Sequence, residues 1–276
     1  MTISYAQLKR AALVWSLCAV TLAPVQAVAG DVIRAGGTGI GLALMKTIGE
    51  HFTAANPDAV IDVLPSLGSS GGIKAVAAKA IDIAIIANRL TPEQAALGLM
   101  EGACLKTAYV FATSYFQPMD INRARLSELY ADPNPTWPDG QALKIILRAR
   151  SGSENPYLIK VVPAMKDALD AAYARSGIPI GSTDQENADL AQRVAGSLSF
   201  MSMLQLRTEK LKLRTLTFEG VEPNMESLTA GTYPLPLDVC LLLRSQPSDA
   251  AARIIAYVRS SDGQQIMRGF DALPLE

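Results

Sequence analysis

The sequence predicts an α/β protein with two lobes, two hinge crossings between them and a ligand cleft where the lobes meet. Apolar strand-like segments alternate with amphipathic segments along the chain, which is typical of largely parallel sheets covered by helices on both faces. The middle third forms a unit of its own, because the chain passes into it near residues 107–116 and returns near residues 230–240. A length of 276 residues suits two units of ordinary size.

These crossings divide the chain into three parts. Residues 1–29 are expected to be a signal peptide. Residues 30–110 together with 231–276 are expected to form lobe 1, and residues 111–230 lobe 2.

Lobe 1 begins with short strands that alternate with helices. A strand at residues 32–33 leads through a glycine-rich segment to a helix with four apolar side chains on one face, Leu44, Met45, Ile48 and Phe52. Strands are also predicted at residues 59–64 and 81–86, and helices at residues 73–80 and after Thr91.

The rest of the chain repeats this alternation. In lobe 2, helices are predicted at residues 123–130, 155–174 and 188–194, and strands at residues 106–116, 143–147, 198–203 and 212–218. The chain then forms a helix at 223–230, a strand within 233–243 and helices at 247–259 and 261–268.

The first 29 residues have the layout of a secretory signal. They contain no acidic residue; Lys9 and Arg10 precede an apolar run at residues 11–24, and Ala27-Val28-Ala29 stands before Gly30. The alternative is a retained anchor, although the run is short for a membrane span. We expect cleavage near Gly30 and a periplasmic mature protein.

Composition narrows the class of protein. Hydrophobic residues make up 49% and charged residues 18%, which suits a packed core, and the net charge of −1 does not indicate a nucleic-acid partner. No grouping of ligand residues indicates a metal or another cofactor. Cys104 and Cys240 remain after cleavage, and the sequence does not decide between a disulfide and two buried thiols.

Three segments share one design, a strand followed by a small-residue loop and a helix start. They are residues 36–41, 67–72 and 148–155. Free N–H groups at a helix start favour anions, and hydroxyls add donors. Arg148 and Arg150 could supply a guanidinium fork for an oxyanion. Loops at strand ends are where open α/β sheets bind ligands.

The order of these segments resembles the periplasmic phosphate-binding proteins of ABC importers. The resemblance rests on Leu67-Gly-Ser-Ser-Gly-Gly-Ile-Lys74, Ile81-Asp-Ile-Ala-Ile-Ile-Ala-Asn-Arg-Leu90, residues 126–140 with Trp137, residues 148–154, and the pair Gly220-Val-Glu-Pro223 and Gly231-Thr-Tyr-Pro-Leu235. It covers nearly the whole mature chain and implies the two-lobed periplasmic-binding-protein fold.

The resemblance also implies a set of cleft residues, namely Thr38, Gly39, Ser69, Ser70, Arg148, Ser151, Gly152 and Ser153. Two positions depart from the family pattern and are expected to set specificity. Ala87 stands where the family has Asp or Ser, and Glu154 stands at a Thr position when the loop is aligned without a gap. A carboxylate aimed into the cleft would repel an oxyanion, so a phosphate-like oxyanion, a small organic anion and a polar organic solute all stay open.

The residues give little support for catalysis. His51 is the only histidine and is expected at the surface, and no G-x-S-x-G turn occurs. Asp184, Glu186 and Asp189 are expected to be a solvated acidic group at a helix start.

We therefore expect a monomeric solute-binding protein, not an enzyme, whose partners are a small-molecule ligand and an ABC permease or membrane sensor. The alternatives are a sensor without a transport role, or a related protein without a small-molecule ligand.

Overall fold

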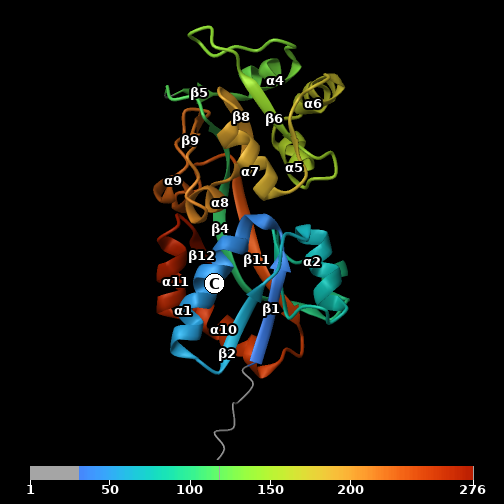
Figure 1. Ribbon diagram of the computed structural model, residues 1–276, viewed down its shortest axis with the longest axis vertical. Helices are drawn as coiled ribbons and strands as arrows, with labels where there is room; N and C mark the ends of the chain where they lie inside the picture. The colour runs from blue at the N-terminus through green and yellow to red at the C-terminus, as the bar shows by residue number, and fades with distance from the viewer. Residues whose placement is uncertain (1–30, 118, 276) are drawn as a thin grey trace, which may run out of the picture.

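The computed structural model describes residues 31–117 and 119–275, and the predicted signal peptide lies outside them. The fold is two-lobed α/β, as the sequence predicts: the elements gather in a lower and an upper group, with two long strands running between them (Figure 1). Within the described ranges, no helix is both long and apolar enough to cross a bilayer.

The lower group in Figure 1 is built from both ends of the chain. Its N-terminal elements are β1 (Asp31–Gly37), η1 (Gly39–Gly41), α1 (Leu42–Ala55), β2 (Ala59–Val63), α2 (Gly68–Ala77), β3 (Ile83–Ile86) and α3 (Pro92–Ala95). Its C-terminal elements are α10 (Asp249–Arg259), α11 (Ser261–Arg268) and β12 (Leu273–Leu275). The connecting strands are β4 (Leu99–Thr113) and β11 (Pro236–Arg244).

The upper group comes from the middle of the chain. Its elements are β5 (Asp120–Ile121), α4 (Arg123–Ala131), β6 (Lys144–Arg148), α5 (Glu154–Val161), α6 (Met165–Ala174), β7 (Ile180–Gly181), α7 (Asp184–Arg193) and β8 (Ser197–Ser202). They are followed by α8 (Met203–Thr208), β9 (Arg214–Thr215), β10 (Thr217–Phe218) and α9 (Met225–Thr229).

Two predicted helices are wrong in extent. The helix expected at residues 73–80 is α2, which already begins at Gly68, within the predicted loop. The helix expected at residues 155–174 is two helices, α5 and α6. Pro163 explains the break, because a proline disfavours helical backbone at the residue before it, and Val162 has φ −128° and ψ 87°.

The sequence predicts a largely parallel sheet, and this prediction is wrong because the main sheet is mixed. Its strand order is β2-β1-β3-β11-β4-β8-β6-β7, with β12 and β9 also paired to β4. The outer strands pair in parallel, β1 with β2 and β3, and β6 with β7 and β8. The two connecting strands are antiparallel to each other and to their neighbours β3 and β8. A chain that leaves a lobe and returns to it must run in both directions between the lobes, which accounts for the antiparallel centre.

Strand β4 changes partner at the crossing. It pairs with β11 from Leu99 to Ala108, and with β8 from Tyr109 to Thr113. Its partner at Ala108 is Pro236, the first residue of β11. Both crossings therefore lie in the predicted segments, and a single sheet continues through them.

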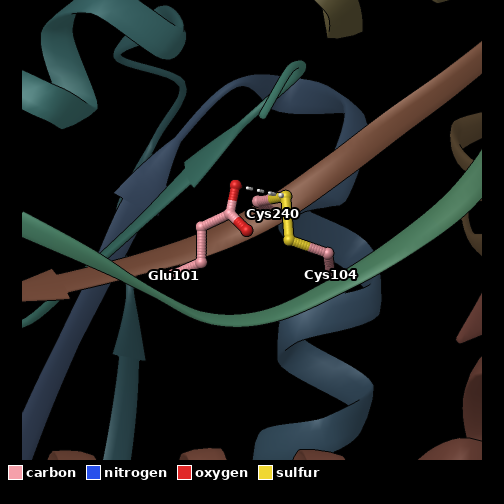
Figure 2. Close-up of side chains that lie close together, drawn as sticks. All are labelled: Glu101, Cys104 and Cys240. Carbon is pink, nitrogen blue, oxygen red and sulfur yellow. Dashed lines mark hydrogen bonds between the residues drawn. A yellow bond between two sulfur atoms is a disulfide. The ribbon is translucent and has the colours of Figure 1, made fainter. Parts of the chain in front are cut away.

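The two cysteines are paired. Cys104 on β4 lies directly opposite Cys240 on β11, with Cα atoms 4.1 Å apart, and their sulfurs form a disulfide (Figure 2). Oε1 of Glu101 lies 3.7 Å from the sulfur of Cys240. The same carboxylate binds Arg89, with its Oε2 2.7 Å from Nη2. The disulfide joins the two connecting strands at Cys104, four residues before β4 changes partner at Ala108.

Candidate functional site

A polar cavity of about 340 Å³ lies between the two groups of elements. Its lining comes from the ends of β1, β6 and β7 and from the starts of α2, α5 and α7, and comprises Thr38, Ser66, Leu67, Gly68, Ser69, Ser70, Arg148, Ser151, Gly152, Ser153, Glu154, Ser182, Thr183 and Asp184. The three loops singled out in the sequence therefore meet at one place. Of the predicted cleft residues Gly39 is not part of this lining, and neither is Ala87.

Thr38 is placed by the end of β1. The preceding Gly37 has φ +142°, and a Cβ on it would stand 2.1 Å from the carbonyl oxygen of Ile85, so only glycine fits. Thr38 is buried at the start of η1, but its hydroxyl does not cap that helix. Instead Oγ1 donates to Oδ2 of Asp184, 3.3 Å away in the other lobe.

The start of α2 forms another wall. Leu67 precedes the helix without a capping side chain, so the first-turn N–H groups are not satisfied by a cap. Oγ of Ser69 accepts the backbone N–H of Ala87 at 3.1 Å, which leaves its own proton for the cavity. Ala87 thus acts through its backbone, and its methyl group packs against the core.

Arg148 is the last residue of β6 and is buried. Its Nη2 lies 3.4 Å from Oε1 of Glu154 and 3.2 Å from Oδ1 of Asp184. Its Nη1 donates to the carbonyl oxygen of Gly181 at 3.3 Å, while Nε has no partner among the described residues. The guanidinium is therefore already shared between two carboxylates.

Glu154 begins α5 and is only 4% exposed. Burial raises the pKa of its carboxyl above the ordinary value; the positive charge of Arg148 opposes this shift and the negative charge of Asp184 adds to it. Its Oε2 is buried and has no hydrogen-bond partner within residues 31–117 and 119–275. Arg150 does not pair with it: this side chain binds Asp170 and lies over the ring of Tyr173 at 4.2 Å.

Asp184 corrects the sequence interpretation. It was expected to be part of a solvated cap, but it is 7% exposed and faces Arg148 and Thr38. The cap of α7 is Thr183, whose hydroxyl accepts the N–H of Glu186 at 3.1 Å. The signal that could have identified Asp184 is its position, because Ser182-Thr183-Asp184 also joins a strand end to a helix start.

Gly39 lies at the contact between the lobes. Its carbonyl oxygen accepts from Nε2 of Gln185 at 3.0 Å, and a Cβ on Gly39 would stand 2.4 Å from Oε1 of that side chain. An adjoining cavity of about 560 Å³ shares Ser66 and Thr183 with the first one. The first turn of α7 therefore touches lobe 1 with open space beside it.

The charged residues in the lining of the first cavity are Arg148, Glu154 and Asp184. Their ionised forms sum to one negative charge. The negative charges of Glu154 and Asp184 also act on Tyr109 of the connecting strand β4. Burial and these two charges raise the pKa of its hydroxyl. The cavity thus offers hydroxyl and N–H donors, and its lining has two acidic side chains against one basic side chain.

Comparison with known proteins identifies the family. The model of the PBP superfamily domain matches residues 24–262. The chain belongs to the PBP superfamily. The phosphate-binding protein PstS 2 of Streptococcus pneumoniae serotype 4 is 29% identical over 112 residues, which is 41% of this chain and 38% of that protein.

Solved structures show the same fold. One is a putative phosphate ABC transporter substrate-binding protein with bound phosphate from Clostridium perfringens, with a TM-score of 0.74 and 16% identity over 89% of this chain and all of the other. Another is an ABC-type phosphate transport receptor from Vibrio cholerae, with a TM-score of 0.59 and 16% identity over 87% of this chain and 99% of the other. These relatives are named as binding proteins and not as enzymes. In this chain, His51 is exposed on α1, as predicted.

Proposed function

We propose that this PBP-superfamily protein captures a small solute between its lobes and delivers it to an ABC importer. One observation carries the proposal: the cavity gathers helix starts, hydroxyls and a buried guanidinium from both lobes at the ends of the strands. Open α/β sheets bind ligands at such strand ends. We assign Thr38, Ser69, Ser70, Arg148, Ser151, Gly152 and Ser153 to the lining of the cleft, and Gly39 to the contact between the lobes beside it.

The working step of this proposal is hinge closure. Two contacts join the lobes beside the cavity, Thr38 with Asp184 and Gly39 with Gln185. We place the hinge where β4 changes partner, between Ala108 and Tyr109. Opening there would break the two contacts and expose the cavity, while the strands of each lobe keep their own pairing.

The same proposal places the protein in the periplasm. The signal-like residues 1–29 and the disulfide both suit export to an oxidising compartment. Mass spectrometry of the periplasmic fraction should find a mature chain that begins near residue 28 or 30. An intact Met1 in the membrane fraction would contradict this location.

Thermal melting with a panel of oxyanions, polyols and amines tests the binding function. A ligand well above its dissociation constant should stabilise the protein by about 3 kcal/mol or more. Arg148→Ala should abolish that shift, since it removes the buried cation, whereas Arg150→Ala should keep it. Unchanged binding by Arg148→Ala would show that other residues form the cleft.

The second candidate function is that of a binding-protein-like partner that takes no small-molecule ligand. It is favoured by the fact that Arg148 and Thr38 already have a partner in Asp184. The absence of a melting shift with every compound in the panel would favour this candidate.

A further inference from the structure

We propose, on the basis of the binding function above, that the cleft takes a solute that carries no net negative charge and presents hydroxyl or amino donors. Asp184 excludes phosphate and similar oxyanions, and Glu154 favours a solute that donates hydrogen bonds. This ligand class differs from the phosphate in the names of the similar proteins.

Asp184 already binds donors of both lobes. Its two oxygens engage the donors that an oxyanion would need from the two lobes, Oδ1 facing Nη2 of Arg148 at 3.2 Å and Oδ2 accepting from Oγ1 of Thr38 at 3.3 Å. The carboxylate is buried with them. An entering oxyanion would have to displace a carboxylate that is covalently part of the wall, so it competes with an anion that cannot leave.

Glu154 leaves one acceptor open in the cavity wall. Oε2 of Glu154 is buried in the cavity wall without a hydrogen-bond partner among the described residues, while Oε1 faces Arg148. A buried polar atom without a partner is costly and is normally satisfied by a ligand or water. A hydroxyl or amino group can donate to Oε2, whereas sulfate has no proton to offer it. Phosphate keeps a proton at neutral pH, so its exclusion rests on Asp184 and on the charge of the cavity.

The charge and the volume of the cavity also favour an uncharged or cationic organic solute over a small dianion. The guanidinium of Arg148 is shared by two carboxylates, so the cavity has no excess positive charge to balance a dianion. The two adjoining cavities, about 340 and 560 Å³, are within the range that holds small organic ligands, roughly 300–1,000 Å³. A solute larger than a four-oxygen anion therefore fits without rearrangement of the lobes.

The experiment compares four proteins by isothermal titration calorimetry and thermal melting. They are the wild type, Asp184→Asn, Glu154→Gln and the control Asp189→Asn. Asp189 lies on the same helix as Asp184 but is exposed and pairs with Arg193, so its substitution makes the same charge change outside the cavity. The probes are inorganic phosphate, sulfate, myo-inositol and putrescine.

The wild type and Asp189→Asn should bind myo-inositol or putrescine and not phosphate or sulfate. Asp184→Asn should raise phosphate affinity, and Glu154→Gln should weaken binding of the donor-bearing probe, each by about tenfold or more, the effect of one charge-assisted hydrogen bond. Melting of each variant without ligand shows whether it is folded, and the two variants test the proposal separately.

Tight phosphate binding by the wild type would overturn the inference and leave the binding function standing. The same holds if Asp184→Asn and Glu154→Gln both fold and leave the affinities for phosphate and the donor-bearing probe unchanged. If neither class of probe binds to any of the four proteins, the binding function fails and this inference fails with it.

Discussion

Arg148→Met tests whether a buried ion network holds the two lobes in this arrangement. The arginine side chain is 9% exposed and is the cation of both Glu154 and Asp184, at 3.4 and 3.2 Å. Methionine keeps much of the volume but leaves two carboxylates buried without their partner. Removal of one member of a buried ionic group costs about 3–5 kcal/mol, so we expect the free energy of unfolding at pH 7 to fall by that amount.

The cost should depend on pH in a defined direction. Burial and Asp184 raise the pKa of Glu154 and Arg148 opposes them, so the variant raises that pKa further. A folded carboxyl with a raised pKa holds its proton more tightly than the unfolded chain does. Its contribution to stability is complete below the unfolded pKa and is lost as the pH rises through the folded pKa. The destabilisation by Arg148→Met should therefore be smaller at pH 5 than at pH 7.

Urea denaturation at pH 5 and pH 7 measures both effects. Arg150→Met is the matched control, because Arg150 and its partner Asp170 are 62% and 64% exposed, and surface pairs are worth about 0–1 kcal/mol. Equal losses for the two variants at pH 7 would refute the role of the buried network. A loss for Arg148→Met that is the same at both pH values would refute the reasoning about Glu154.

Three further predictions concern other parts of the protein. Replacement of Cys104 and Cys240 by alanine should lower the free energy of unfolding by about 5 kcal/mol, since the bond closes a separation of 136 residues, and a reductant should lower the melting temperature of the wild type alone. The free energy of unfolding of the wild type should fall as the pH rises above 4.5, and that of Glu154→Gln should fall less. An equal fall in the two proteins would contradict the raised pKa of Glu154. Gly39→Val should push Gln185 away and separate the lobes, so small-angle scattering should give a larger radius of gyration than for the wild type; an unchanged radius would show that the contact yields locally.

The order of elements could be predicted from the sequence because each signal is local. The apolar spacing of α1 and the Thr91–Pro92 start of α3 act within one or two turns, and both helices are present. The antiparallel centre of the sheet could not be predicted in this way, because the partner of β4 is β11, more than a hundred residues away. Strand direction depends on that long-range pairing and leaves no mark on either strand alone.

In the site, too, local sequence patterns could be predicted and long-range contacts could not. Thr38, Ser69 and Arg148 could be found because glycine- and hydroxyl-rich loops at strand ends are visible in the sequence, and the cavity brings them together. The sequence assigns Asp184 to a solvated cap, because an acidic side chain at a helix start is already explained by the helix dipole; only its place after a strand end points to the cleft. What distinguishes Asp184 is its burial against the guanidinium of Arg148 on β6. This contact depends on the folded chain and is not visible in the sequence around Asp184.

The disulfide gives the protein a closed covalent loop. Residues 105–239 run from one bonded cysteine to the other, so the sulfur bond and the backbone together form a ring that holds every element of the upper group. A protease that cuts this ring once leaves both fragments attached, and they would separate only on a reducing gel. The bond also fixes the base of β4 and β11 at one register, so any bending of these strands has to take place on the far side of it, toward the cavity.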